Sequence, residues 1–398
     1  MMKTKLRRYK YIAVVLLALI ASGVGRAQVQ TQANATNNAA ACPQRKATVE
    51  AAFDAIAAKY SSDIVGMCVG AIGLNGEYAA TKCYGETQTG SGIRPTDHTL
   101  FWTGSVTKTM TATLLALRVN QGFVQLNDRV DNYLPSAYHI PKITLLQLAD
   151  MESGLQRNPP DPYTKPADET QLYTDLQTCV GDSTCWKGIN HYSYSNFGYG
   201  VLGNVLANHD GPLKWSLDNF YYVMAPLGMF DTKTSEDYDS ADFLLRRAYG
   251  HIRSGAGDWT LSRTTNQSFG VAPAGGLWST STDMLIWLGN ATGVLQGNPG
   301  VDAALGMTME CRGPWGKNST CSSVQDCGSC TGLAWTEDID PCTVGIRISK
   351  SGAVPGFKSW IGFVKGPGRG TGRGVFVLLN SGAINGDTVG EQLLDMIP

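Results

Sequence analysis

The residues best suited to chemistry in this 398-residue chain are Ser105 and Lys108, at the start of a segment with helical apolar spacing. The spacing predicts a helix that ends near Gly122 and carries the serine and the lysine on one face. A serine hydroxyl needs a base to take its proton, and a partly neutral lysine can be that base. Burial, a helix N-terminus and a second cation would each lower the lysine pKa enough. An ordinary capped helix is the alternative interpretation.

Residues 1–27 have the pattern of an export signal: basic residues, an apolar run over 12–21, and the small-x-small stretch Gly25-Arg26-Ala27. The run is too short to span a bilayer, and no cysteine follows it directly. We therefore expect a periplasmic or secreted chain without a stable membrane anchor. Removal of residues 1–27 deletes six basic and no acidic residues, and it moves the formal charge of the chain from −1 to −7. This negative charge disfavours a nucleic-acid partner.

Ten cysteines in an exported chain predict disulfides. Asn75-Gly76 is a strong hairpin signal, and a two-residue turn there would make residues whose numbers sum to 151 face each other. That register places Cys68 opposite Cys83, within disulfide reach. We also expect Cys179 and Cys185 to close a small loop.

A Gly/Ser-rich insertion over 311–342 holds five cysteines, an odd number that requires one partner outside it. Cys42 is the remaining candidate, and the individual pairings stay open. Zinc is the alternative, because Cys327-x-x-Cys330 has metal-ligand spacing. No histidine lies in this stretch and the compartment oxidises thiols, so we expect disulfides and no metal. The insertion cysteines are Cys311, Cys321, Cys327, Cys330 and Cys342.

The order of predicted elements indicates one α/β domain interrupted by a mostly α domain. Helices are expected at 46–60, 281–289 and 387–397, a hairpin at 63–84, and strands at 343–350, 358–364 and 374–380. The predicted organisation is a signal peptide at 1–27, a loose tail at 28–42, an α/β domain formed by 43–110 and 270–398, a mostly α domain at 111–269, and the Cys-rich insertion at 311–342.

Two further stretches could complete a site with the serine. Tyr194 lies at a predicted loop-to-helix junction, and a tyrosine held near cations loses its proton more easily. Lys350-Ser351-Gly352 ends an amphipathic strand and offers a cation and a hydroxyl to a carboxylate, while Gly352 leaves space beside the strand.

In this order, Ser105-x-x-Lys108, Tyr194-x-Asn196 and Lys350-Ser351-Gly352 resemble the three motifs of the penicillin-recognising serine hydrolases. The tyrosine-containing middle motif is similar to that of class C β-lactamases and D-Ala-D-Ala carboxypeptidases. The resemblance covers roughly 46–398 and implies a β-lactamase/transpeptidase-like α/β (α+β) fold. Such a fold has an antiparallel sheet flanked by N- and C-terminal helices, with an inserted mostly α domain.

The resemblance also implies roles for the matching residues. Ser105 would attack a carbonyl and become acylated, while Lys108 and Tyr194 share the proton transfers. Lys350 would support the tyrosine and a substrate carboxylate. The substrate-binding set implied by the resemblance is Asn196 for an amide, Ser351 for the carboxylate, and Gly352 with Ala353, whose N–H joins that of Ser105 in an oxyanion hole.

The expected activity is therefore hydrolysis of β-lactams through an acyl-enzyme, without a metal or organic cofactor. A D-Ala-D-Ala carboxypeptidase or endopeptidase, a promiscuous esterase and a non-catalytic envelope protein are the alternatives. The expected partner is a small-molecule or peptide substrate. A Ser-His-Asp triad is disfavoured, because no Gly-x-Ser-x-Gly elbow occurs. The Cys-rich insertion is expected to lie over one edge of the site and narrow the substrate range.

Overall fold

The computed structural model describes residues 42–140, 142–160, 169–210, 214–234, 237–254, 257–262, 269–313, 323–343, 345–365 and 372–398. The predicted signal peptide, nearly all of the predicted loose tail, and Cys321 lie outside the described residues.

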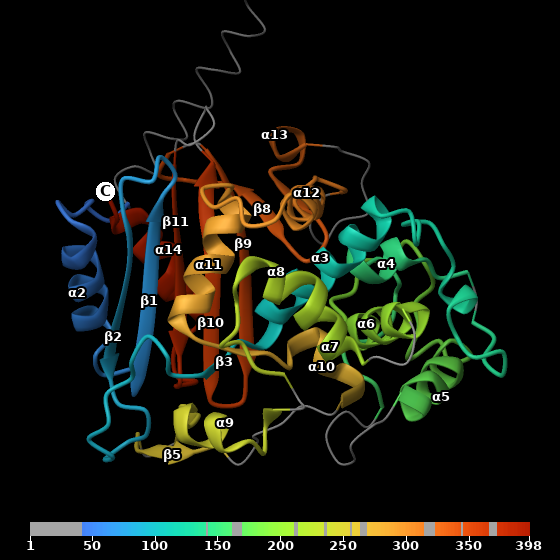
Figure 1. Ribbon diagram of the computed structural model, residues 1–398, viewed down its shortest axis with the longest axis horizontal. Helices are drawn as coiled ribbons and strands as arrows, with labels where there is room; N and C mark the ends of the chain where they lie inside the picture. The colour runs from blue at the N-terminus through green and yellow to red at the C-terminus, as the bar shows by residue number, and fades with distance from the viewer. Residues whose placement is uncertain are drawn as a thin grey trace, which may run out of the picture.

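A seven-stranded sheet runs through the described part of the chain in the order β2-β1-β11-β10-β9-β8-β7, and each strand is antiparallel to its neighbours (Figure 1). Because β11 pairs with β1, the two ends of the chain build one sheet. The predicted fold class is confirmed. The strands of this sheet are β1 (Gly66–Gly73), β2 (Ala79–Gly85), β7 (Ser329–Thr331), β8 (Thr336–Ile339), β9 (Ile346–Val354), β10 (Phe357–Lys365) and β11 (Gly372–Leu379).

The first hairpin has the predicted register but a wider turn. Cys68 faces Cys83 and the two form a disulfide. The N–H of Gly73 donates to the carbonyl of Tyr78 at 3.0 Å, so the turn spans residues 74–77 rather than two residues. The register is unchanged because residues 73 and 78 also sum to 151.

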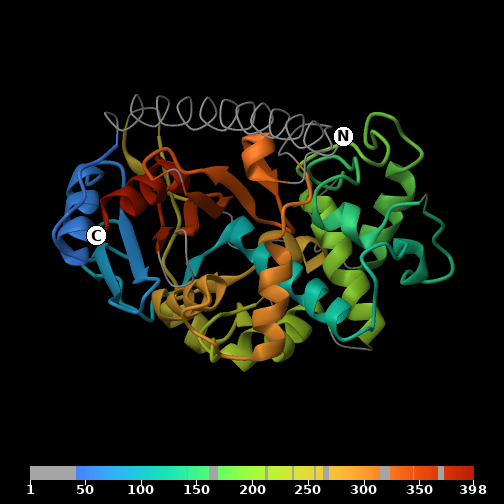
Figure 2. The ribbon, with the colours of Figure 1, turned by 90° about the horizontal axis from the view of Figure 1, so that it is seen from above.

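Helices cover both faces of the sheet. Alternate strand residues point to opposite faces, so Val377 joins the core on one side of β11 while Phe376 and Leu378 join the core on the other. Figures 1 and 2 show α2 and α14 together on the outer side of the sheet. The helices on the two faces are α2 (Val49–Lys59) and α14 (Gly386–Met396) outside and α11 (Ser281–Thr292) inside.

The rest of the chain forms a mostly helical region beside the sheet, at the right of Figure 1. Its centre is α3 (Thr107–Asn120), whose residues 107–118 are all buried, as in a helix enclosed by others. Packed against it are α6 (Asn196–Asp210), α7 (Trp215–Asn219), α10 (Ala272–Gly275) and α12 (Pro299–Thr308). Further from it lie α4 (Leu145–Ala149), α5 (Glu169–Cys179) and α8 (Ala225–Leu227). Smaller elements are α9 (Ala241–Arg246), α13 (Val324–Cys327) and the paired strands β3 (Phe101–Trp102) with β6 (Trp278–Ser279) and β4 (His251–Arg253) with β5 (Trp259–Leu261).

The Cys-rich insertion contributes to the main sheet, which the sequence did not predict. Its strands β7 and β8 extend the sheet beyond β9. Disulfides Cys42–Cys342 and Cys311–Cys330 tie it to the N-terminus of the described chain and to itself. Zinc coordination by the Cys327-x-x-Cys330 pair is therefore wrong, because Cys330 is bonded to another cysteine. Within the ranges given above, no helix is long and apolar enough to cross a membrane.

Candidate active site

Ser105 lies where β9 contacts the turn that leads into α3. It occupies a 3₁₀ turn (Gly104–Val106), rather than the first α-helical turn. Two glycines permit the close approach. A Cβ on Gly352 would lie 2.1 Å from the carbonyl oxygen of Thr103, and one on Gly104, whose φ is +53°, would lie 3.0 Å from the N–H of Ala353. The backbone N–H groups of Ser105 and Ala353 are thereby brought to the same spot.

Lys108 is fully buried beneath the serine, one helical turn along α3. Its Nζ lies 3.2 Å from Ser105 Oγ and donates to Asn196 Oδ1 at 2.7 Å and to the carbonyl of Ala274 at 2.5 Å. Burial lowers the pKa of Lys108 to about 8, with the nearby Lys350 charge acting in the same direction and Tyr194 opposing it. The amine is therefore within reach of its neutral form near neutral pH, as a base requires.

Tyr194 approaches the serine from the other side. Its hydroxyl donates to Ser105 Oγ at 2.7 Å, and its ring centroid lies 4.9 Å from Lys108 Nζ and 5.5 Å from Lys350 Nζ. Burial raises the pKa of the phenol, but the charges of Lys108 and Lys350 and the hydrogen bond with Ser105 outweigh burial and lower the pKa to about 7. The tyrosine and Lys108 titrate as a coupled pair, so a proton can pass between them at the serine.

The tyrosine is held by the segment before α6. The N–H of Asn196 donates to the carbonyl of Arg157 at 2.7 Å, and Ser195 Oγ donates to the carbonyl of Gln156 at 2.7 Å. The Ser195 hydroxyl also accepts the N–H of Gly198 at 2.8 Å, which caps the helix. Residues 156–157 therefore fix the second and third positions of the Tyr194-x-Asn196 motif.

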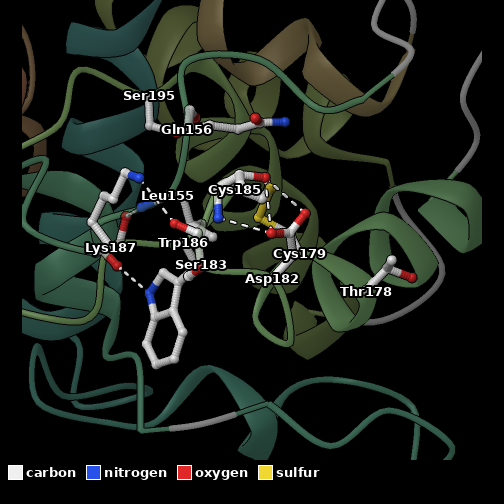
Figure 3. Close-up of a disulfide and its surroundings, with 12 residues drawn as sticks. Leu155, Gln156, Thr178, Cys179, Asp182, Ser183, Cys185, Trp186, Lys187 and Ser195 are labelled. Carbon is white, nitrogen blue, oxygen red and sulfur yellow. Dashed lines mark hydrogen bonds between the residues drawn. A yellow bond between two sulfur atoms is a disulfide. The ribbon is translucent and has the colours of Figure 1, made fainter.

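A disulfide supports that segment in turn. Cys179 and Cys185 close a small loop, and the N–H of Gln156 donates to the carbonyl of Cys185 at 2.8 Å. Figure 3 shows Gln156 beside the disulfide and the indole of Trp186 pointing away from it. The indole N–H donates to the carbonyl of Ser153 at 2.8 Å, which fixes the loop against the same segment.

The third motif lies on β9. Lys350 is nearly buried, and its ammonium donates to the carbonyl of Ser351 at 2.8 Å. Asn196 points at the same space, and its Nδ2 donates to Asn158 Oδ1 at 2.8 Å. Every residue of the three predicted motifs is thus brought to one place, whereas their catalytic and binding roles stay predictions.

These groups line a cleft of about 520 Å³. We call its part formed by Ser105, Tyr194 and Lys350 the serine wall. Acidic residues line the rest, and we call them the acidic wall: Asp338 of β8 with Asp387 and Glu391 of α14. Sequence analysis missed these acidic residues, and it missed Arg157, which also lines the cleft. No spacing rule points to them, because each comes from a different element than the motifs.

The arrangement can carry out acyl transfer. A phenolate or neutral amine beside Ser105 can take the serine proton as the oxygen attacks a carbonyl. The clustered N–H groups of Ser105 and Ala353 can bind the oxygen that becomes negative. The same phenol can then return the proton to the leaving group.

Comparison with known proteins agrees with this geometry. A family model described as "Beta-lactamase" matches residues 49–391. The D-alanyl-D-alanine-carboxypeptidase/endopeptidase AmpH of Escherichia coli is 28% identical over 240 residues, which are 58% of each chain. The teichoic acid D-alanine hydrolase of Staphylococcus aureus is 28% identical over 216 residues, 54% of this chain and 51% of that protein. The chain thus spans little more than half the length of these curated relatives.

Solved structures share the fold. A class C β-lactamase from Rhodobacter sphaeroides superposes with a TM-score of 0.69 at 24% identity, covering 87% of this chain and 97% of that one. A β-lactamase/D-alanine carboxypeptidase from Pseudomonas syringae gives 0.70 at 19% identity, covering 87% and 98%. Since the family model spans most of the sequence, the chain belongs to the beta-lactamase family of serine hydrolases.

Proposed function

We propose that this chain is an exported serine acyl-hydrolase that opens β-lactams through an acyl-enzyme at Ser105. The observation that carries the proposal is the convergence on one hydroxyl: Tyr194 O lies 2.7 Å and Lys108 Nζ 3.2 Å from Ser105 Oγ. Two candidate bases at hydrogen-bond distance from one serine are what covalent catalysis by serine needs.

In the proposed reaction, the phenolate of Tyr194 accepts the Ser105 proton while the oxygen attacks the lactam carbonyl. The lactam C–N bond breaks, and the nitrogen takes the proton from Tyr194. Water then attacks the acyl-enzyme ester and gives a proton to the same phenolate. The C–O bond to Ser105 breaks, and the departing Ser105 oxygen takes that proton back from Tyr194. The charge of Lys108 stabilises the phenolate throughout.

The third motif supports a substrate with a carboxylate. Lys350 and Ser351 lie beside the serine on β9, and an ammonium with a hydroxyl is a suitable pair for an anionic oxygen. The β-lactams and the D-alanyl peptides both carry a carboxylate near the bond that is cleaved. An uncharged ester offers no anionic group that Lys350 could bind.

Cleavage of D-alanyl peptides is the second candidate, and the names of the curated relatives favour it. Both the AmpH protein and the teichoic acid hydrolase are named for bonds to D-alanine. The two candidate functions share acylation of Ser105 and differ in the donor and in how quickly water reaches the acyl-enzyme.

Export rests on two observations. The first 27 residues have the signal pattern, and the described chain holds disulfides at Cys42–Cys342, Cys68–Cys83, Cys179–Cys185 and Cys311–Cys330. Disulfides form and persist in oxidising compartments. We therefore place the mature chain in the periplasm or outside the cell.

A substrate panel tests the proposal. Purified protein is given nitrocefin, a D-Ala-D-Ala peptide and p-nitrophenyl butyrate, and acylation by benzylpenicillin is followed by mass spectrometry. We expect turnover of nitrocefin and an adduct on Ser105 that Ser105→Ala abolishes without loss of the folded state. Release of D-alanine without nitrocefin turnover would favour the second candidate. Turnover of the ester alone would favour an esterase, and the absence of both turnover and adduct would favour a non-catalytic protein.

A further inference from the structure

Arg157 is a third cation at the tyrosine, and none of the three motifs includes it. Its guanidinium carbon lies 5.0 Å from the ring centroid of Tyr194, and the residue lines the cleft. Lys108 and Lys350 are both buried, whereas Arg157 is exposed to the cleft. It is therefore the cation at this wall that a solute reaches most easily.

The backbone of Arg157 has a fixed place relative to the motif. Its carbonyl accepts the N–H groups of Asn196 at 2.7 Å and Phe197 at 3.3 Å. The aromatic face of Tyr194 restrains the side chain from one side through a cation–π contact. The salt bridges found among the described residues do not include Arg157, and its planar N–H fork has the geometry to bind a carboxylate.

The charges around the cleft indicate which part of a substrate meets this fork. Asn196, the predicted partner of the acyl amide, donates to Asn158, the residue after Arg157. With Asn196 binding the acyl amide as predicted, the acyl side of a donor at Ser105 would extend toward Asn158 and its neighbour Arg157. Asp338 and Glu391 also line the cleft, and their carboxylates would disfavour an anion close to them.

We propose that Arg157 is a specificity-determining residue that binds a carboxylate on the acyl part of the substrate. The inference rests on the proposed function and goes beyond it, because it names the acyl donors that this enzyme prefers: those with an anionic group close to the acyl amide. Lys350 would bind the carboxylate on the leaving-group side of the donor. Arg157 and Lys350 would thus bind opposite ends of the same substrate.

Two penicillins that differ by one carboxylate test this. Benzylpenicillin lacks a charge on its acyl side chain, and carbenicillin carries a carboxylate there. The measurement is the second-order rate constant for acylation of Ser105 by each, followed by mass spectrometry at low ionic strength. The readout is the carbenicillin-to-benzylpenicillin ratio, which a general loss of structure would not change.

We expect Arg157→Gln to lower this ratio roughly tenfold, because a charge-assisted contact at an exposed position is lost. Arg157→Lys keeps the charge without the fork and should lower it about threefold. The matched control is Lys187→Gln, which removes an exposed positive charge outside the cleft and should leave the ratio unchanged.

Three results are decisive. A fall in the ratio for Arg157→Gln, partly restored by lysine, supports the inference. An unchanged ratio in a variant that benzylpenicillin still acylates overturns the inference and leaves the proposed function standing. Failure of both penicillins to acylate the wild-type protein overturns the proposed function and this inference with it.

Discussion

The two walls of the cleft are built in different ways. The serine wall comes from the 3₁₀ turn that leads into α3, the segment that leads into α6, and β9. Its polar atoms are joined by short contacts such as that from Lys108 Nζ to Asn196 Oδ1 at 2.7 Å. The acidic wall comes from the Cys-rich insertion and α14, and its carboxylates are partly exposed. There Glu391 meets Arg347 only at 3.4 Å.

The electrostatics of the walls follow from this construction. On the serine wall, neighbouring cations lower the pKa of Tyr194 to about 7 against the effect of burial. On the acidic wall, burial raises the pKa of Asp338 and Glu391, with Arg347 opposing it. We therefore expect the first wall to move the proton and the second to affect which substrates bind. Substitutions on the serine wall should therefore change the acylation rate, and substitutions on the acidic wall should change substrate selectivity or stability.

The largest effect is expected for Tyr194→Phe, which removes the hydroxyl 2.7 Å from Ser105 Oγ. Loss of a general base typically slows a reaction by about 10²–10⁴-fold. Acylation by benzylpenicillin, measured by mass spectrometry, should slow by that factor while the thermal unfolding curve is unchanged. Tyr221→Phe, at an exposed tyrosine, is the matched control and should acylate normally. A Tyr194→Phe protein that retained a third of the rate would assign the base to Lys108 alone.

A disulfide on each wall allows a direct comparison. Replacing Cys179 and Cys185 by serine should lower the free energy of unfolding by about 2–3 kcal/mol, because a small loop is released in the unfolded chain. It should also slow acylation, since Cys185 holds Gln156 and hence the tyrosine segment. Denaturant unfolding and acylation rates are the measurements.

The corresponding change at Cys311 and Cys330 is the control for this comparison. It opens a longer loop, with a sequence separation of 19 against 6, and should destabilise the protein at least as much. Its effect on acylation should nevertheless be the smaller one, because that loop belongs to the acidic wall. If replacing Cys311 and Cys330 slowed acylation more than replacing Cys179 and Cys185, the proposed difference in role between the two walls would be wrong.

The sequence predicted the serine wall better than the acidic one. Ser105 and Lys108 lie one helical turn apart, so local spacing is enough to bring them together. The hairpin register followed from Asn75-Gly76, although the turn itself is wider than predicted. These signals are local, and local signals can be read without knowing the fold.

The acidic wall depends on contacts between distant segments. Strands β7 and β8 are only three and four residues long, too short for alternation to be recognised. Asp338 reaches the cleft only because β8 pairs with β9, and Glu391 only because α14 packs against the sheet. Neither pairing leaves a pattern in the sequence, and the same holds for the ring contact between Arg157 and Tyr194.

The pH profile of the serine wall gives a further prediction. If the phenolate is the active form, acylation rises with pH through the Tyr194 pKa of about 7. Lys350→Gln removes a cation that lowers this pKa, so the midpoint of the acid limb should move up by roughly one pH unit. Lys365→Gln, at an exposed end of β10, is the control and should keep the wild-type midpoint. An unmoved midpoint in Lys350→Gln would mean that another group limits the rate at low pH.

The smallest effect is expected from a substitution of Asp150, in a small cavity that Asp150 and Glu152 line together with Arg312 of the insertion. We call this cavity the seam. Burial raises the pKa of Asp150 to about 7, the Glu152 charge adds to this, and Arg312 opposes it. A raised carboxyl pKa favours the folded state fully below the unfolded value of about 3.9, and this stabilisation is lost as the pH rises through about 7.

Asp150→Asn removes that titration. At pH 8 the variant should be more stable than the wild type by about 1 kcal/mol, after allowance for water reaching the cavity, and at pH 4 the two should be equal. Urea unfolding at both pH values measures this, with Asp258→Asn, at an exposed carboxylate, as the control. Since the seam lies behind Tyr192 rather than at Ser105, the acylation rate should change less than for Tyr194→Phe. A stability difference that is the same at pH 4 and pH 8 would show that the carboxyl is not the titrating group, and that the seam joins the walls by packing alone.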